Sequence, residues 1–382
     1  MRVLGTEITM LDSIRRRAEA DLGIKLSFEC QDFLSAQQRA ATHPETYDVY
    51  DQCFHNLDIV WFWRAIQAID TARIPLWAEV SDLTKVGRLT PDAPLGEGNI
   101  PNKRLYVQPD GTLGNAPSAQ IAMLPAVHNM DGFAVTESLL AALPGPPSWA
   151  WLLDKSVSGR VALVDEPAIG IFDAALAARA CGEFHPENIG NLTIREIDRL
   201  IHLLMERRRK GHFSAFWKTA ADSVAILASG RAGIQSIWSP AITALAAQST
   251  PVVEVAPQEG YRAWHGGMCL SRHLKGRMRD VAYEYLNWWL SGWPGAVMAR
   301  QGYYMSAPRR VRDWLAPEEW DYWYEGKPAA LDLEGPDKRV VVRRGQVRSG
   351  GSYWRKASNI AVWNTTMDEH NYLARRWQDF VK

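Results

Sequence analysis

The fold is decided by three segments: GRAGIQSIWSPAITALAA (230–247), PVVEVAPQEGYRAWHGGMCLSR (251–272) and MARQGYYMSAP (298–308). Strand-like and helix-like patterns alternate in these segments, and glycine and aromatic residues gather where the strands end. This arrangement is typical of α/β proteins that bind a ligand at the ends of their strands. We therefore expect a two-lobed α/β protein with a ligand cleft between the lobes.

Composition excludes several partner classes. The 382 residues suffice for two domains, and 47% hydrophobic with 23% charged residues is ordinary for a globular protein. Basic and acidic residues both number 43, so the net charge is zero and no nucleic-acid partner is expected. The densest apolar run, Ile59–Trp63, stops at Arg64 and is far shorter than the ~18 residues of a membrane span.

The tryptophan and cysteine residues further limit the kinds of binding site to expect. Most of the 17 Trp residues should pack in the core, and a few should line a cleft. Cys30, Cys53, Cys181 and Cys269 lack the spacing of metal ligands, so we expect no metal and no cofactor. A single Cys30–Cys53 bridge stays open as an alternative to four unpaired cysteines.

The first half alternates strand and helix patterns. The expected elements are strands at 2–4, 24–30 and 47–51 and helices at 9–22, 33–42 and 57–69. Such alternation favours a parallel sheet, whose ligands lie beyond the carboxyl ends of the strands. The loops Gly5–Glu7 and Gln52–His55 are the candidates. Residues 81–118 are rich in Gly, Pro and Asn, and we expect a small hairpin there, turning at Pro109–Gly111.

A second α/β unit starts near Gly132. It continues through a strand at 160–164, helices at 171–180 and 194–209, and a strand at 234–238. Chain direction then returns to the first unit near Met268, so two segments, near 129–135 and 265–270, should cross between lobes and form a hinge. The expected division is lobe 1 at 1–130 and 268–310, lobe 2 at 131–267, and a tail at 311–382 that packs across both lobes.

The order of segments resembles a known family. GIKLSFEC, YDVYDQCF, VSGRVALVDE, AGIQSIWSPA and YEYLNWWLSGWPGAVMARQGYYMSAP follow one another as in the periplasmic solute-binding proteins of ABC importers, particularly the spermidine/putrescine-binding branch of the type II fold. The resemblance implies two lobes, each a mainly parallel sheet flanked by helices, with the ligand cleft between them. It also implies a monomer that is not an enzyme, a periplasmic location after removal of a signal segment, and two partners, a small solute and a membrane permease.

Matching by order implies a set of cleft residues. These are Thr6, Glu7, Gln52, Cys53, His55, Glu166, Trp238, Trp264 and Arg355. Polyamine binders of this kind place aromatic walls around methylene chains and carboxylates on ammonium groups. Here His265-Gly266-Gly267 follows Trp264, and Pro167 follows Glu166, so two expected acids are missing. With the extra cation Arg355, this favours a zwitterion, an amino-acid derivative or opine-like conjugate, over a long polyamine, unless Arg355 pairs on the surface.

Two rival functions fit the fold class less well. An enzyme on a bilobal α/β fold is the first, but the sequence has no phosphate loop, GxSxG, HExxH or GxGxxG motif. The effector-binding domain of a DNA-binding regulator is the second, but the chain starts with a strand where such a protein needs a helix-turn-helix. The basic run Glu206–Lys210 is interpreted as a solvated helix end before Gly211.

Overall fold

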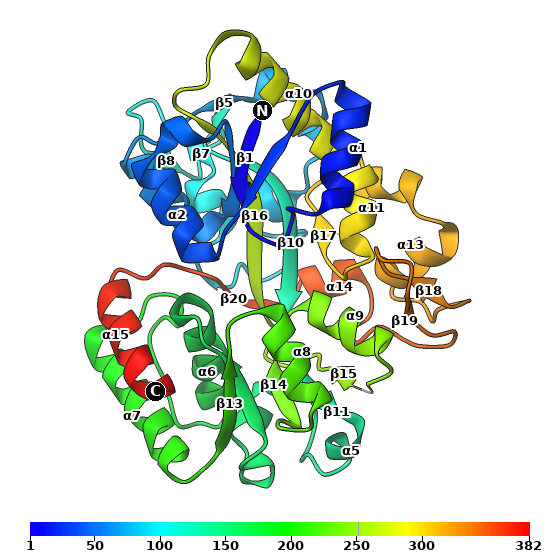
Figure 1. Ribbon diagram of the computed structural model, residues 1–382. Helices are drawn as coiled ribbons and strands as arrows, with labels where there is room; N and C mark the ends of the chain where they lie inside the picture. Colours follow the sequence, from blue (N-terminus) through cyan, green and yellow to red (C-terminus); the bar gives the residue numbers. More distant parts are fainter. Residues whose placement is uncertain (251) are drawn as a thin grey trace.

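The structure is a computed structural model that describes residues 1–250 and 252–382. It has two lobes, each built on one large sheet, with the upper lobe of Figure 1 containing the N-terminus. We call the upper one lobe 1 and the lower one lobe 2. This confirms the expected two-lobed α/β fold.

Lobe 1 is built on a nine-stranded sheet with the core order β17-β10-β16-β3-β1-β2 and with β20, β6 and β4 at its side. Its strands are β1 (Arg2–Gly5), β2 (Ser27–Cys30), β3 (Val49–Cys53), β4 (Ile66–Gln67), β6 (Glu97–Gly98), β10 (Leu124–Asp131), β16 (Tyr261–Ser271), β17 (Tyr304–Met305) and β20 (Ile360–Trp363). Its helices include α1 (Asp12–Leu22), α2 (Phe33–Thr42), α3 (Leu57–Phe62), α4 (Asp82–Lys85), α10 (Gly276–Leu290) and α11 (Trp293–Ala299). The strands β1, β2 and β3 pair in parallel, whereas β16 runs antiparallel to β10 and β3 and parallel to β20.

Two local backbone features explain where the helices of lobe 1 end as the sequence predicts and where they do not. Helix α1 ends at Gly23, whose positive φ of 64° supplies the left-handed cap. Helix α3 ends at Phe62 and not near Ile69 as expected, because Arg64 also takes a positive φ, 49°, and turns the chain. The expected hairpin is present as β7 (Tyr106–Val107) paired with β8 (Leu113–Gly114), in a small sheet with β5 (Ile69–Asp70) and β9 (Gln120–Ile121).

Cys30 and Cys53 are both free, which excludes the bridge left open by the sequence. They are the last residues of β2 and β3, and β1 lies between these two strands. A disulfide needs Cα atoms closer than about 7 Å, and strands two places apart in a sheet are about 9–10 Å apart. The two thiols therefore serve as separate side chains.

Lobe 2 is built on a five-stranded sheet with the order β13-β12-β14-β11-β15. Its strands are β11 (Phe133–Thr136), β12 (Val161–Val164), β13 (Phe213–Trp217), β14 (Ile234–Ser236) and β15 (Val252–Glu254), and its helices are α5 (Glu137–Leu140), α6 (Pro167–Ala180), α7 (Ile194–Arg209), α8 (Ala220–Ala228) and α9 (Ser239–Ala247). The parallel strands β12, β13 and β14 end at one edge, which positions the starts of α6, α8 and α9 together. That edge carries Glu166, Lys218 and Trp238.

Three connections join the lobes (Figure 1). The first leaves β10 at Asp131 and enters β11 after Gly132. The second is the entry into β16, which pairs with β10 from Arg262 to Met268, so the return to lobe 1 begins earlier than the expected boundary at 267. The third follows β20 and leads into α15 (His370–Val381). We propose a lobe boundary near residue 261 in place of 267.

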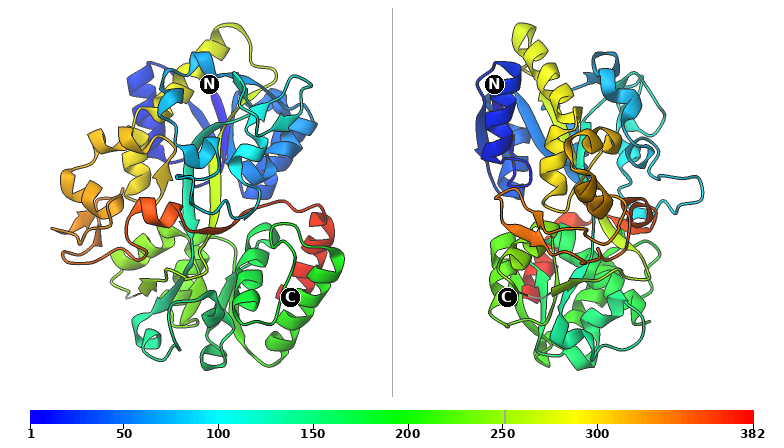
Figure 2. Two further views of the ribbon diagram at one scale, coloured as in Figure 1. Left: turned by 180° about the vertical axis from the view of Figure 1, so that it is seen from behind. Right: turned by 90° about the vertical axis from the view of Figure 1, so that its right-hand side faces the viewer.

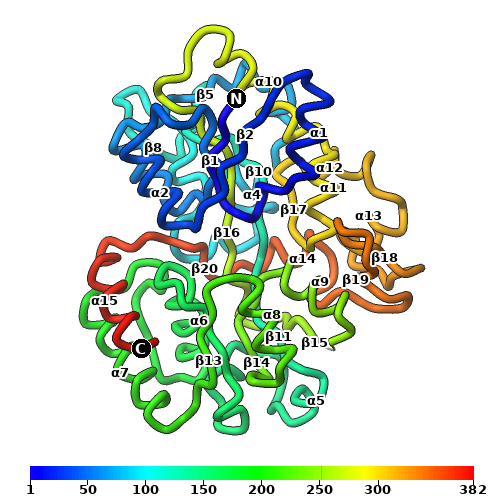
Figure 3. Tube along the Cα trace, viewed as in Figure 1, coloured from blue at the N-terminus to red at the C-terminus, as the bar shows by residue number. Residues whose placement is uncertain are grey.

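The segment from Pro308 to the C-terminus contacts both lobes. They contain α12 (Pro308–Val311), α13 (Pro317–Trp323), β18 (Leu333–Glu334), β19 (Val340–Val342), α14 (Tyr353–Ala357), β20 and α15. Strand β20 joins the lobe 1 sheet, β19 contacts α9, and α15 packs on α6 and α7. The left view of Figure 2 shows this segment crossing the molecule, from orange on one side to red on the other, and Figure 3 shows the C-terminus in the lobe opposite to the N-terminus. Among the described residues, no helix has the length and apolarity that crossing a membrane requires.

Candidate functional site

Two lobe 1 strands end beside the crossing strands. The turn after β1 carries Thr6, which is 9% exposed, and Glu7, which is exposed. Cys53 ends β3 and pairs in register with Gly266 of β16. Burial raises the pKa of Tyr303, and electrostatic repulsion from Asp131, Glu7 and Cys53 raises it further. The end of β3 therefore lies beside the crossing strand β16.

Trp264 and Tyr303 form an aromatic corner at this place. Their ring centroids are 5.3 Å apart and their planes are almost perpendicular, at 89°. The Nε1–H group of Trp264 donates to Asp131 Oδ2 over 2.9 Å, which fixes the ring. A Cβ atom at Gly266 would lie 3.6 Å from Trp264 Cζ3, so the indole lies against a residue without a side chain. The corner offers an apolar wall with a carboxylate at its edge.

A buried ionic cluster lies behind the corner. Arg262 Nε donates to Asp173 Oδ1 over 2.7 Å, Nη1 donates to Asn364 Oδ1 over 3.3 Å, and Nη1 lies 3.5 Å from Asp131 Oδ2. All three charged side chains are at most 1% exposed. Burial raises the pKa of Asp131 to about 6 although Arg262 opposes the shift, and burial also raises the pKa of Asp173. Two carboxylates thus share one cation.

The lobe 2 edge faces this cluster from the other side. The Glu166 carboxylate caps α6 by accepting from the backbone N–H of Ala168 over 3.2 Å. Burial raises the pKa of Glu166, and one of the smaller contributions comes from Asp32, which caps α2 in lobe 1. Trp238 packs edge-on against Trp217, with centroids 4.8 Å apart. Glu166 and Trp238 are thus the N-cap residues of α6 and α9, which start at the same edge of the lobe 2 sheet.

Three further expected ligand residues, Gln52, His55 and Arg355, make different contacts. Gln52 Nε2 donates to the carbonyl of Phe33 over 3.4 Å, and His55 stacks on the Phe33 ring with centroids 4.8 Å apart. Burial lowers the pKa of His55 to about 3, so the ring is neutral. Arg355 is exposed on α14, and its guanidinium group has no ion pair or hydrogen bond among the residues that the structure describes.

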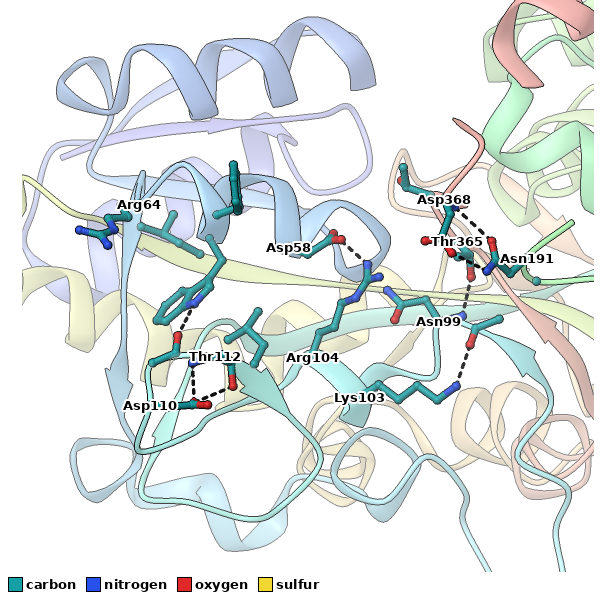
Figure 4. Close-up of a pocket in the computed structure, with 18 of the residues that line it drawn as sticks. Asp58, Arg64, Asn99, Lys103, Arg104, Asp110, Thr112, Asn191, Thr365 and Asp368 are labelled. Carbon is teal, nitrogen blue, oxygen red and sulfur yellow. Dashed lines mark hydrogen bonds and ion pairs between the residues drawn. The ribbon is translucent and has the colours of Figure 1, made fainter. Parts of the chain in front are cut away.

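A separate cavity of about 890 Å³ lies beside α3 and is lined by both lobes. Figure 4 shows one ion pair in it, Asp58 with Arg104 at 2.8 Å, and a hydrogen bond from Asn191 Nδ2 to Asp368 at 2.8 Å. None of the expected ligand residues lines it. For that reason we place the candidate ligand site at the aromatic corner. Within the described chain, no three His, Cys, Asp or Glu side chains gather as metal ligands.

Comparisons with known proteins agree with this architecture. Residues 16–304 match the family model of bacterial extracellular solute-binding proteins. The chain belongs to this family. No curated protein matches the chain in a separate search.

Solved structures share the fold of this solute-binding protein at low sequence identity. The spermidine/putrescine ABC transporter substrate-binding protein PotD of Streptococcus pneumoniae is 12% identical with a TM-score of 0.63, and the TpPotD lipoprotein of Treponema pallidum is 11% identical with a TM-score of 0.67. The PBP MotA of A. tumefaciens, solved with glucopine, is 12% identical with a TM-score of 0.61. Each comparison covers 100% of this chain and 99% of the other chain.

Sequence reasoning missed three residues of the solute-binding protein's candidate site. Asp131 and Arg262 face each other in the β10–β16 register, and such a pairing between distant segments has no local sequence signal. Tyr303 belongs to the GYYMSAP motif that helped to indicate the fold. An aromatic residue directly after the positive-φ Gly302 was a usable signal for it.

The solute-binding protein should lose stability as pH rises, and Asp51 should be one cause. Asp51 is 5% exposed, its Oδ2 atom has no hydrogen-bond partner, and burial raises its pKa to about 7. A raised pKa in the folded state means that its stabilising contribution is present below about pH 4 and is lost as pH rises through about 7. Asp51→Asn should therefore be about 4 kcal/mol more stable than the wild type at pH 8 and similar to it at pH 4.

Urea unfolding at pH 4, 6 and 8 measures this difference. The matched control is Asp12→Asn, because Asp12 is exposed and its pKa is lowered by Arg15. Equal pH slopes for Asp51→Asn and the wild type would show that Asp51 ionises freely in the folded protein.

Proposed function

We propose that this protein is the substrate-binding component of an ABC importer that captures a small amine-containing solute between its lobes. Closure about the three connections buries the solute, and the closed form delivers it to a membrane permease from the periplasmic side. A ligand that contacts both lobes favours the closed form because it binds that form better. The protein acts in this role as a monomer.

One observation supports an amine above other solutes. Asp131, a buried carboxylate, borders the corner of Trp264 and Tyr303. An ammonium group gains from both features, since aromatic faces attract cations and a buried cation needs a carboxylate. Glu7 and Glu166 add negative charge on either side of the junction.

Two amine classes fit these surroundings, polyamine-like solutes and zwitterions such as amino-acid or opine-like conjugates. The zwitterion requires a cation for its carboxylate, and Arg355 remains our proposal for that role because its guanidinium group has no partner among the described residues. The structural relatives named above include proteins described as spermidine/putrescine-binding and one solved with glucopine. Both classes therefore belong in the first binding experiment.

A thermal-shift panel tests the proposed function. The probes are putrescine, spermidine, 4-aminobutyrate and an opine-like conjugate, with glucose and succinate as solutes without an amine. At 100 times the dissociation constant, a bound amine should raise the melting temperature by about 3 °C or more. Glucose and succinate should leave it unchanged. A response to glucose or succinate alone would overturn the proposal.

A further inference from the structure

The last residue of β10 lies at the centre of the molecule. Asp131 ends the first connection between the lobes, and it touches Trp264 of the second connection. It is 2% exposed, and its charge raises the pKa of Tyr303, which forms the aromatic corner with Trp264. We infer that Asp131 is the carboxylate that binds the ammonium group of the ligand and that it couples ligand binding to the hinge. This inference rests on the proposed function and assigns its specificity to one residue.

Unused hydrogen-bond acceptors beside Asp131 support the assignment. The Nδ2 group of Asn129 donates to Asp131 Oδ1 over 2.7 Å and to Ser239 Oγ over 2.8 Å, which fixes the orientation of the amide. Its oxygen is then left buried with no donor. The hydroxyl group of Tyr303, a residue only 3% exposed, also makes no hydrogen bond to any described residue. An ammonium group brings three N–H donors, whereas a carboxylate ligand brings none.

The net charge around Asp131 also favours a ligand with an ammonium group. Arg262 supplies one positive charge to the carboxylates of Asp131 and Asp173, so the ionised cluster carries one excess negative charge. Glu254 on β15 and the buried Lys356 also act on Asp131, and these two groups pair with each other at 3.0 Å, so together they add no net charge. A ligand ammonium group brings the cluster to neutrality, and buried charges are stable only when they are paired.

The same cluster joins all three connections between the lobes. Asp131 belongs to the first, Arg262 to the second, and Asn364 follows β20 in the third. Asp173 adds helix α6 of lobe 2. A cation on Asp131 therefore acts on the group that fixes the relative position of the connections, so ligand binding and hinge geometry are linked through one carboxylate.

The test compares Asp131→Asn with Asp58→Asn, using the amine from the probe panel that shifts the wild type most. Asp58 pairs with Arg104 in the separate cavity, so the control also examines the other candidate site. Titration calorimetry should show affinity at least about 100-fold weaker for Asp131→Asn and within about threefold of the wild type for Asp58→Asn. Circular dichroism confirms that each variant is folded. If Asp131→Asn does not fold, Tyr303→Phe replaces it and should bind at least about fivefold more weakly.

The outcomes separate the two claims. Amine binding by the wild type and equally by Asp131→Asn would overturn the assignment and leave the proposed function standing. A loss confined to Asp58→Asn would overturn the assignment and move the site to the separate cavity. A wild type that responds to none of the amines would overturn both claims.

Discussion

Replacing Arg262 by Met should lower the free energy of unfolding by about 3–5 kcal/mol. The guanidinium group is the only cation that pairs with Asp131 and Asp173 among the described residues, and all three side chains are at most 1% exposed. Met fills a similar volume but leaves both carboxylates buried without a positive charge. The loss of stability should be larger at pH 8 than at pH 5. Burial raises the pKa of each carboxyl group, so both carboxylates bind protons more readily at the lower pH.

An exposed ion pair provides the control. Arg310 pairs with Glu79, and their side chains are 41% and 34% exposed. Arg310→Met should change stability by less than about 1 kcal/mol. Urea unfolding followed by circular dichroism measures both variants at pH 5 and 8. An Arg262→Met protein as stable as Arg310→Met would show that the cluster does not hold the connections together.

Trp377→Ala should be about as destabilising, by about 3–5 kcal/mol. Trp377 is fully buried and attaches the last helix, α15, to lobe 2. Its ring packs so closely on α6 that a Cβ atom at Gly170 would lie 2.4 Å from Trp377 Cζ2. Removing the indole leaves a large cavity, and cavities of that size in a close-packed core are costly.

Trp63→Ala is the matched control for this change. Trp63 is 60% exposed, and its loss should alter stability by less than about 0.5 kcal/mol. Hydrogen exchange of α15 adds a local measurement, since the helix should exchange faster in Trp377→Ala. An unchanged melting temperature and unchanged exchange would contradict the structural role that we assign to the tail.

Local sequence patterns predicted much of the fold because they report burial and capping. Gly23 marked the end of α1, and the turn at Pro109–Gly111 marked a hairpin that the structure contains. Strand β13 and helix α8 were missed although signals were present. Phe213, Ala215 and Trp217 alternate along β13, and Thr219 forms a capping box at the start of α8. These signals are short, and the neighbouring long basic helix dominates the pattern.

The candidate site was harder to predict because it depends on long-range register. Strand ends directed attention to Glu7 and Cys53, which follow from chain direction alone. Because Asp131 precedes a glycine, the sequence suggests that it belongs to a turn. Only its pairing with Arg262 across the two strands shows that it is part of a buried cluster. Propensity does not encode which strand will lie beside which.

The most direct measurement is a titration of the wild type with two ligands that differ only in one group. The first is the amine that gives the largest thermal shift, and the second is its analogue with a hydroxyl group in place of the amine. Calorimetry should show one site with micromolar or tighter affinity for the amine and at least about 100-fold weaker binding of the alcohol. Equal affinity for the two ligands would contradict the account, because it would show that no buried carboxylate binds the ammonium group of the solute.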